Sequence, residues 1–201
     1  MVDYCPDSRL QKQIDFIKEI DGLKTILRQS LHLNDDRREN DAEHAWTVSL
    51  MAVLLSEYAS APVNIQRVVK MLLIHDIVEL DAGDLFAYDD DQAKAAQRKR
   101  EYKAAERIFS ILPEDQAKDL KALWTEFEQG KSDDALFANS MDRLSPLLLN
   151  YTTGGKMWKK HGVKKDRVLT RNKSIKKGSD KLWEYAEHLI NGAVEKGYIG
   201  T

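Results

Sequence analysis

The stretch MLLIHDIVELDAGD, residues 71–84, places three ionisable side chains within the five residues 75–79 of a largely apolar segment. The segment is apolar around nearly the whole circumference of a helix, which predicts that it lies inside the protein. His75, Asp76 and Glu79 nevertheless follow one another closely within it. Because an unpaired buried charge is costly, these groups need a compensating partner, and a bound cation would supply one.

The size and charge of the chain exclude some partners. Its 201 residues fit one domain with a sizeable core. Since 31 Lys and Arg stand against 33 Asp and Glu, the formal net charge is only -2. No overall field therefore attracts nucleic acid or an anionic membrane, and such a partner would need a local patch.

Cysteine usage and the N-terminal sequence indicate the compartment. Cys5 is the only cysteine, which excludes an internal disulfide and a thiolate zinc cluster and suits a reducing environment. The N-terminal residues lack the basic start and apolar stretch of a secretory signal, and no run of about 18 apolar residues occurs. We expect a soluble, cytoplasmic protein with no membrane partner.

The hydrophobic spacing is helical almost throughout, which predicts an all-α fold, a single-domain bundle built around the central buried helix. We assign residues 1–201 to one domain, with a motif core at about 23–151 and a C-terminal polar segment and helix at 152–201. Asn40 or Asp41 caps one helix and Asn64 caps the central one, which Gly83 closes in a left-handed conformation. The expected helices span about 10–21, 23–31, 42–59, 65–82, 92–112, 113–129, 133–151 and 179–195.

The helical geometry predicts how the central segment presents its ligands. Adjacent helical residues point about 100° apart, so His75 and Asp76 can both reach one ion while Glu79, one turn from His75, stands at its edge. Imidazole with carboxylate suits Zn, Mn, Fe or Co, and Mg more weakly. Two ligands are too few for a stable site, so His44 and Asp142 on other helices are the candidates for the remainder.

Two observations bear on these candidates. Pro146 has no amide hydrogen to donate to the carbonyl of Asp142, which predicts a kink or local opening of that helix beside the site. A bend that only follows the core surface would use the same proline. For His75, the alternative interpretation is a hydrogen-bonded core histidine without a metal.

Four motifs follow one another in a recognisable order: E-H-A-W at 43–46, H-D-x-x-E at 75–79, G-D at 83–84 and M-D-R-L at 141–144. In this order the chain resembles the HD-domain metal-dependent phosphohydrolases. The resemblance is closest to the small all-α 5′-deoxynucleotidase-like branch and extends from about Leu23 to Tyr151.

The resemblance implies a role for each motif residue. Glu79 would be the acid/base residue, Asp84 a second catalytic or water-orienting carboxylate, and Arg28 the phosphate-binding arginine. An aromatic often follows that arginine in the nucleotidase branch, whereas Gln29 follows here, and Lys24, Arg37 and Arg38 are alternative cations. One divalent metal ion would be held by four residues: His44, His75, Asp76 and Asp142.

The implied function is metal-dependent hydrolysis of a nucleoside 5′-monophosphate. Alternatives are a phosphodiesterase, a hydrolase of a signalling nucleotide, or a non-catalytic module that binds a nucleotide. The basic stretch 156–177 is either a solvated surface that draws in an anionic substrate or a nucleic-acid strip. The apolar run LSPLLLNY, 144–151, exceeds what one helix face needs, so we expect a homodimer.

Overall fold

Helices and one short hairpin make up the computed structural model, which describes residues 7–85, 88 and 91–200. Cys5 lies outside the described residues. No helix of the described part is both long and apolar enough to cross a membrane. The elements of the first half are α1 (Ser8–Ile20), η1 (Asp21–Thr25), β1 (Leu27–Leu31), β2 (Arg38–Asn40), α2 (Asp41–Leu55), η2 (Ser56–Tyr58), α3 (Ile65–Ile74) and α4 (Glu79–Ala82). Those of the second half are α5 (Asp91–Phe109), α6 (Glu114–Gln129), α7 (Asp133–Thr152), α8 (Lys156–Lys160), α9 (Lys165–Asn172), α10 (Ile175–Gly178) and α11 (Asp180–Glu195).

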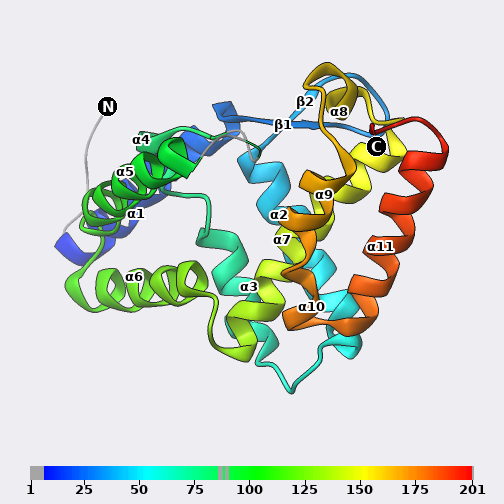
Figure 1. Ribbon diagram of the computed structural model, residues 1–201. Coiled ribbons are helices and arrows are strands. Elements are labelled where there is room, and N and C mark those ends of the chain that lie inside the picture. Colours follow the sequence, from blue (N-terminus) through cyan, green and yellow to red (C-terminus); the bar gives the residue numbers. More distant parts are fainter. Residues whose placement is uncertain (1–6, 86–87, 89–90, 201) are drawn as a thin grey trace.

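Helices α2, α3 and α7 pack against one another at the centre of the molecule (Figure 1). α5 and α6 lie on one side of this centre, and α9, α10 and α11 lie on the other. Each large apolar side chain that is fully buried contributes roughly 1.5–3 kcal/mol of transfer free energy. The centre buries such side chains from all three helices, among them Val48, Val68, Met71, Leu72, Phe137 and Met141. The all-α fold is confirmed, and its core lies directly around the expected ligands.

The central buried helix is shorter than predicted. α3 ends at Ile74, and α4 begins at Glu79. Between them the amides of Ile77 and Glu79 donate to carbonyls three residues back, at 3.3 and 2.9 Å. The backbone around His75 and Asp76 therefore forms tighter turns, with hydrogen bonds between residues three apart, and the α-helix does not continue through it. Gly83 has φ 74° and ψ 156°, so its φ is positive but its ψ is extended, which differs from the left-handed helical cap that we expected.

The predicted helix at 23–31 is wrong. This segment forms η1 and then β1, which pairs in antiparallel orientation with β2. The guanidinium of Arg38 donates to the carbonyls of Leu27 and Arg28, and the amide of Asp41 donates to the carbonyl of Ile26. In these contacts, residues outside the segment donate hydrogen bonds to its backbone carbonyls. The tertiary environment therefore overrides the helical spacing of its apolar residues.

The C-terminal polar segment is folded and packed. It forms the short helices α8, α9 and α10, and it buries Trp158, Val168 and Ile175 in the core. Its basic side chains are therefore carried by helices that pack against the core. Most basic side chains of the stretch 156–177 are nevertheless exposed to solvent.

Helix α7 runs without interruption through Pro146 from Asp133 to Thr152. Its leucines Leu144 and Leu147 are buried inside the same chain, so they do not provide an exposed dimer seam. Four of the exposed apolar side chains lie together along one face of α2: Trp46, Leu50, Val53 and Leu54.

The approach of α10 to α7 has a testable energetic consequence. A Cβ on Gly178 would come within 2.4 Å of both the Leu136 carbonyl oxygen and Ser140 Oγ. We expect Gly178→Ala to lower the free energy of unfolding by about 1–3 kcal/mol in urea denaturation, because this contact has no room for a methyl group. Gly200→Ala is the control, since a Cβ there meets nothing within 4 Å. Equal stability of the two variants would contradict the close packing.

Candidate metal centre

The start of α2 fixes the position of His44. The Asn40 side chain accepts a hydrogen bond from the Glu43 amide at 3.0 Å, and the Glu43 carboxylate accepts one from the Asn40 amide at 3.0 Å. This reciprocal capping box satisfies the first turn and sets the direction of the helix. His44, in that turn, is completely buried and faces α7.

The turn after α3 fixes His75. Its Nδ1 lies 2.8 Å from the carbonyl oxygen of Leu72, so Nδ1–H is the donor, and in the neutral imidazole Nε2 carries the lone pair. The carbonyl of His75 in turn accepts a hydrogen bond from Trp124 Nε1 at 3.1 Å. These two contacts hold the imidazole with Nε2 pointing toward His44 and Asp142.

Asp142 on α7 joins the two histidines. Its Oδ1 lies 3.1 Å from His44 Nε2 and 3.6 Å from His75 Nε2. One potential ligand atom from each of the three residues lies within 4.8 Å of the others. Three helices that are distant in sequence therefore bring two imidazoles and a carboxylate to one point.

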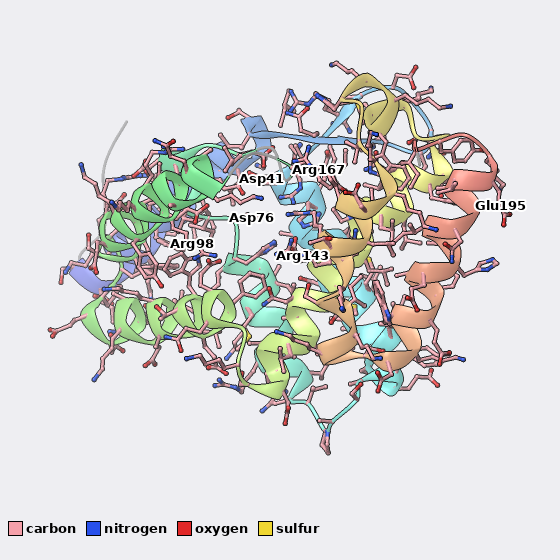
Figure 2. The ribbon with its side chains drawn as sticks, viewed as in Figure 1. Asp41, Asp76, Arg98, Arg143, Arg167 and Glu195 are labelled. Carbon is pink, nitrogen blue, oxygen red and sulfur yellow. The ribbon has the colours of Figure 1, made fainter. Side chains whose placement is uncertain are left out.

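Asp76 lies at the edge of this cluster. Its Oδ2 is 3.1 Å from His75 Nε2, and the same oxygen accepts a hydrogen bond from Arg28. Figure 2 shows Asp76 and Asp41 in the middle of the molecule, between the pair α5 and α6 and the C-terminal helices. The four expected ligands thus share one buried region, and Asp76 differs from the others in being bonded to a cationic side chain.

Arg28 on β1 reaches the same region. Its Nη1 lies 3.2 Å from Asp41 Oδ1, and its guanidinium is 3.9 Å from oxygens of Glu39 and Asp142. Burial lowers the pKa of Arg28, but the negative charges of Asp76, Glu79 and Asp142 raise it well above its usual value.

The alternative cations contact other groups. Lys24 pairs with Asp21, Arg37 pairs with Glu43, and Arg38 donates to backbone carbonyls of the hairpin. Of these candidates, Arg28 is the cation that the structure brings to the cluster.

Glu39 and Asp41 belong to this region, and the sequence reasoning missed both. Glu39 Oε2 lies 3.5 Å from His44 Nδ1, and Asp41 is completely buried beside Arg28. Their position on either side of the capping Asn40 was the available signal. Residues 34–40 are polar in sequence, but β2 turns Glu39 inward toward the site.

Glu79 and Asp84 stand on the side of the cluster formed by α4. Burial, together with the charges of Asp76 and Asp41, raises the pKa of Glu79 well above its usual range. Burial also raises the pKa of Asp84, which lines a cavity together with Arg28. The site is therefore rich in carboxylates that are removed from bulk water.

The donor set fits a divalent metal. His75 Nε2 is buried and has no hydrogen-bond partner among the described residues. Burial lowers the pKa of His75, but the carboxylates of Asp76 and Asp142 raise it to about 10. The same negative field attracts a metal cation, and imidazole nitrogens with carboxylate oxygens are ligands for borderline divalent ions.

Known proteins are similar to this chain in sequence and in fold. The sequence model of the HD domain matches residues 20–183. The human 5′-deoxynucleotidase HDDC2 is 30% identical over 136 residues, which are 67% of this chain and 65% of that protein. A 5′-deoxynucleotidase from Yersinia pestis is 25% identical over 60% of this chain and 64% of its own length. The chain thus spans slightly less than two thirds of the length of these curated relatives.

A solved structure agrees over the whole chain. The predicted metal-dependent phosphohydrolase from Magnetospirillum magnetotacticum MS-1 is 50% identical, with a TM-score of 0.93 and 100% of both chains covered. An HD-domain phosphohydrolase from Listeria innocua, 16% identical, matches with a TM-score of 0.60 over 89% of this chain and 83% of its own, and so shares the fold. With most of its length matched by the family model, the chain belongs to the HD-domain family.

Proposed function

We propose that the protein is a metal-dependent phosphohydrolase that cleaves a nucleoside 5′-monophosphate to nucleoside and phosphate. The observation that carries this proposal is the buried cluster of His44, His75 and Asp142 with Arg28 beside it. A metal site next to a buried guanidinium suits a phosphate ester, since both groups neutralise phosphoryl oxygens. The names of the curated relatives support a nucleotide as the substrate.

The proposed metal ligands are His44, His75, Asp76 and Asp142. A bound divalent ion supplies Lewis-acid polarisation of the phosphoryl group and lowers the pKa of water to roughly 7. The arrangement around the two histidines supports this assignment. His75 turns Nδ1 to a backbone carbonyl, while His44 turns Nδ1 toward Glu39, which leaves both Nε2 atoms for the site.

The proposed catalytic residues surround the reacting phosphate. Glu79 accepts the proton of the attacking water, and Asp84 orients that water. The water oxygen forms a bond to phosphorus, the bond from phosphorus to the 5′ oxygen breaks, and the leaving oxygen receives from Glu79 the proton that Glu79 took from the water. Arg28 binds two phosphoryl oxygens with its planar guanidinium, which Asp41 holds in position.

The assembly and cellular location are part of the same proposal. We infer a homodimer, supported by the exposed apolar face of α2. A single cysteine in the sequence supports a cytoplasmic location.

A panel of phosphate esters tests the function directly. The purified protein with Mn²⁺ or Co²⁺ should release inorganic phosphate from nucleoside 5′-monophosphates, because the metal and Arg28 together neutralise a terminal phosphate. The panel should include 3′-monophosphates, cyclic nucleotides and a phosphodiester. Faster cleavage of a diester would indicate a phosphodiesterase, and no cleavage in any arm would support a non-catalytic module.

Two substitutions separate the proposed metal ligands from the proposed base. Asp76→Ala should lose bound metal and activity together. Glu79→Ala should keep its metal but lose about 10²–10⁴-fold in turnover, because general-base catalysis contributes that much. Metal content by mass spectrometry and released phosphate are the two readouts. Asp81→Asn, a more exposed change on the same α4, is the control. Retained metal in pure Asp76→Ala would remove Asp76 from the ligand set.

A further inference from the structure

A cavity adjoins the metal centre and extends toward the C-terminal helices. Arg28 and Asp84 form its end at the centre. About 670 Å³ of it is free of protein atoms, part of this space being open solvent. Its farther walls come from α7, α8, α9 and the loop between α8 and α9, and they include Arg143, Leu147, Asn150, Trp158, Val163 and Arg171. A substrate with its phosphate at Arg28 would place its remaining part here.

Two arginines on different helices line this wall. Arg143 follows Asp142 on α7, and Arg171 lies on α9. Arg143 Nε is buried and makes no hydrogen bond within the described part of the chain, and Asp142 Oδ2 is 3.8 Å away from it. In the view of Figure 2, Arg143 lies between Asp76 and α9. A buried donor without a partner is costly, so a bound acceptor at this position would stabilise it.

The charges of these arginines repel each other. Burial and the nearby charge of Arg143 lower the pKa of Arg171 to about 10. A bound anion in contact with both guanidiniums would offset the repulsion and the loss of hydration. Arginine side chains present a rigid planar fork that matches phosphate oxygens, so a phosphate group fits this pair well.

Asn150 supplies a hydrogen-bond acceptor to the cavity, whereas the two arginines supply donors. Its Nδ2 donates to the Pro146 carbonyl at 2.8 Å, which fixes the orientation of the amide. Its Oδ1 is buried and has no hydrogen-bond partner among the described residues. This oxygen can accept a hydrogen bond from a hydroxyl or amino group in the cavity. Buried Trp158 and Val163 add apolar surface, so the cavity suits a ring system with polar substituents and an anionic group.

We propose that Arg143 and Arg171 bind a second phosphate of the substrate, which makes the substrate a nucleotide that carries a phosphate on its sugar as well as the scissile 5′-phosphate. This inference rests on the proposed function. Asn150 accepts a hydrogen bond from the sugar or base of the same molecule. A second phosphate joined directly to the first would instead lie at the acidic end of the cavity, near Asp76 and Asp84, where repulsion disfavours it.

The selectivity of the enzyme tests the inference. We would measure kcat/KM for the 3′,5′-bisphosphate, the 5′-monophosphate and the 5′-diphosphate of the deoxynucleoside that the phosphate-release panel identifies. The wild-type protein should prefer the bisphosphate over the monophosphate by about 10- to 100-fold, as expected for hydrogen bonds to a charged group. Arg171→Gln should reduce this ratio toward one. Lys173→Gln removes the same charge from the exposed end of α9 and should leave the ratio unchanged.

Several outcomes would overturn the second subsite. One is a wild-type ratio near one, and another is a preference for the 5′-diphosphate. A third is an equal loss on both substrates in Arg171→Gln, which would assign this arginine to the scissile phosphate or to folding. Arg143→Gln serves as the second variant if Arg171→Gln does not fold, and circular dichroism establishes folding.

Calorimetry separates this inference from the proposed function. If the protein cleaves none of the nucleotides, deoxyadenosine 3′,5′-bisphosphate and 5′-monophosphate are titrated into chelator-treated protein. Binding of the bisphosphate that is about tenfold tighter, and that is lost in Arg171→Gln, would support the subsite although the proposed reaction had failed. If no nucleotide is cleaved, equal binding of the two nucleotides would reject the subsite as well as the proposed reaction. If the monophosphate is cleaved and the bisphosphate is not preferred, only the subsite is rejected.

Discussion

The structure depends on the compensation of negative charge at its centre. Asp76 and Asp142 approach two buried imidazoles, while Glu39 and Asp41 stand behind them. Carboxylates removed from water are stable only beside cations or hydrogen-bond donors. Arg28 supplies one positive charge, and the fully buried His44 and nearly buried His75 are the proposed nitrogen ligands. A divalent ion at the proposed site would add positive charge to this group of carboxylates.

The surrounding elements hold this centre rigidly. A capping box starts α2 immediately before His44, and the indole of Trp124 holds the backbone at His75. The hairpin of β1 and β2 brings Arg28 and Glu39 to the cluster, where the Arg28 guanidinium lies 3.9 Å from oxygens of Glu39 and of Asp142 on α7. This preorganisation is what catalysis by a positioned metal and guanidinium requires.

Much of the fold and of the site could be predicted from the sequence. The apolar period around 68–78 predicted the buried segment, and motif order placed His44, His75, Asp76 and Asp142 together. The interruption after Ile74 could not be predicted, because it arises from tertiary contacts of the His75 carbonyl. The hairpin at Arg28 was missed because its helical spacing is overridden by pairing with β2. Glu39 was missed because the hairpin turns it inward, and Asp41 was considered only as a helix cap, whereas it is completely buried at the start of α2.

The central proposal is that His44, His75, Asp76 and Asp142 coordinate one metal ion. A crystal structure of the protein grown with Zn²⁺, with anomalous diffraction recorded at the zinc absorption edge, tests it most directly. We predict a single strong peak at about 2.0–2.2 Å from both histidine Nε2 atoms and from the carboxylates. An anomalous map without a peak at this position, with the histidines hydrogen-bonded only to protein groups, would contradict the account.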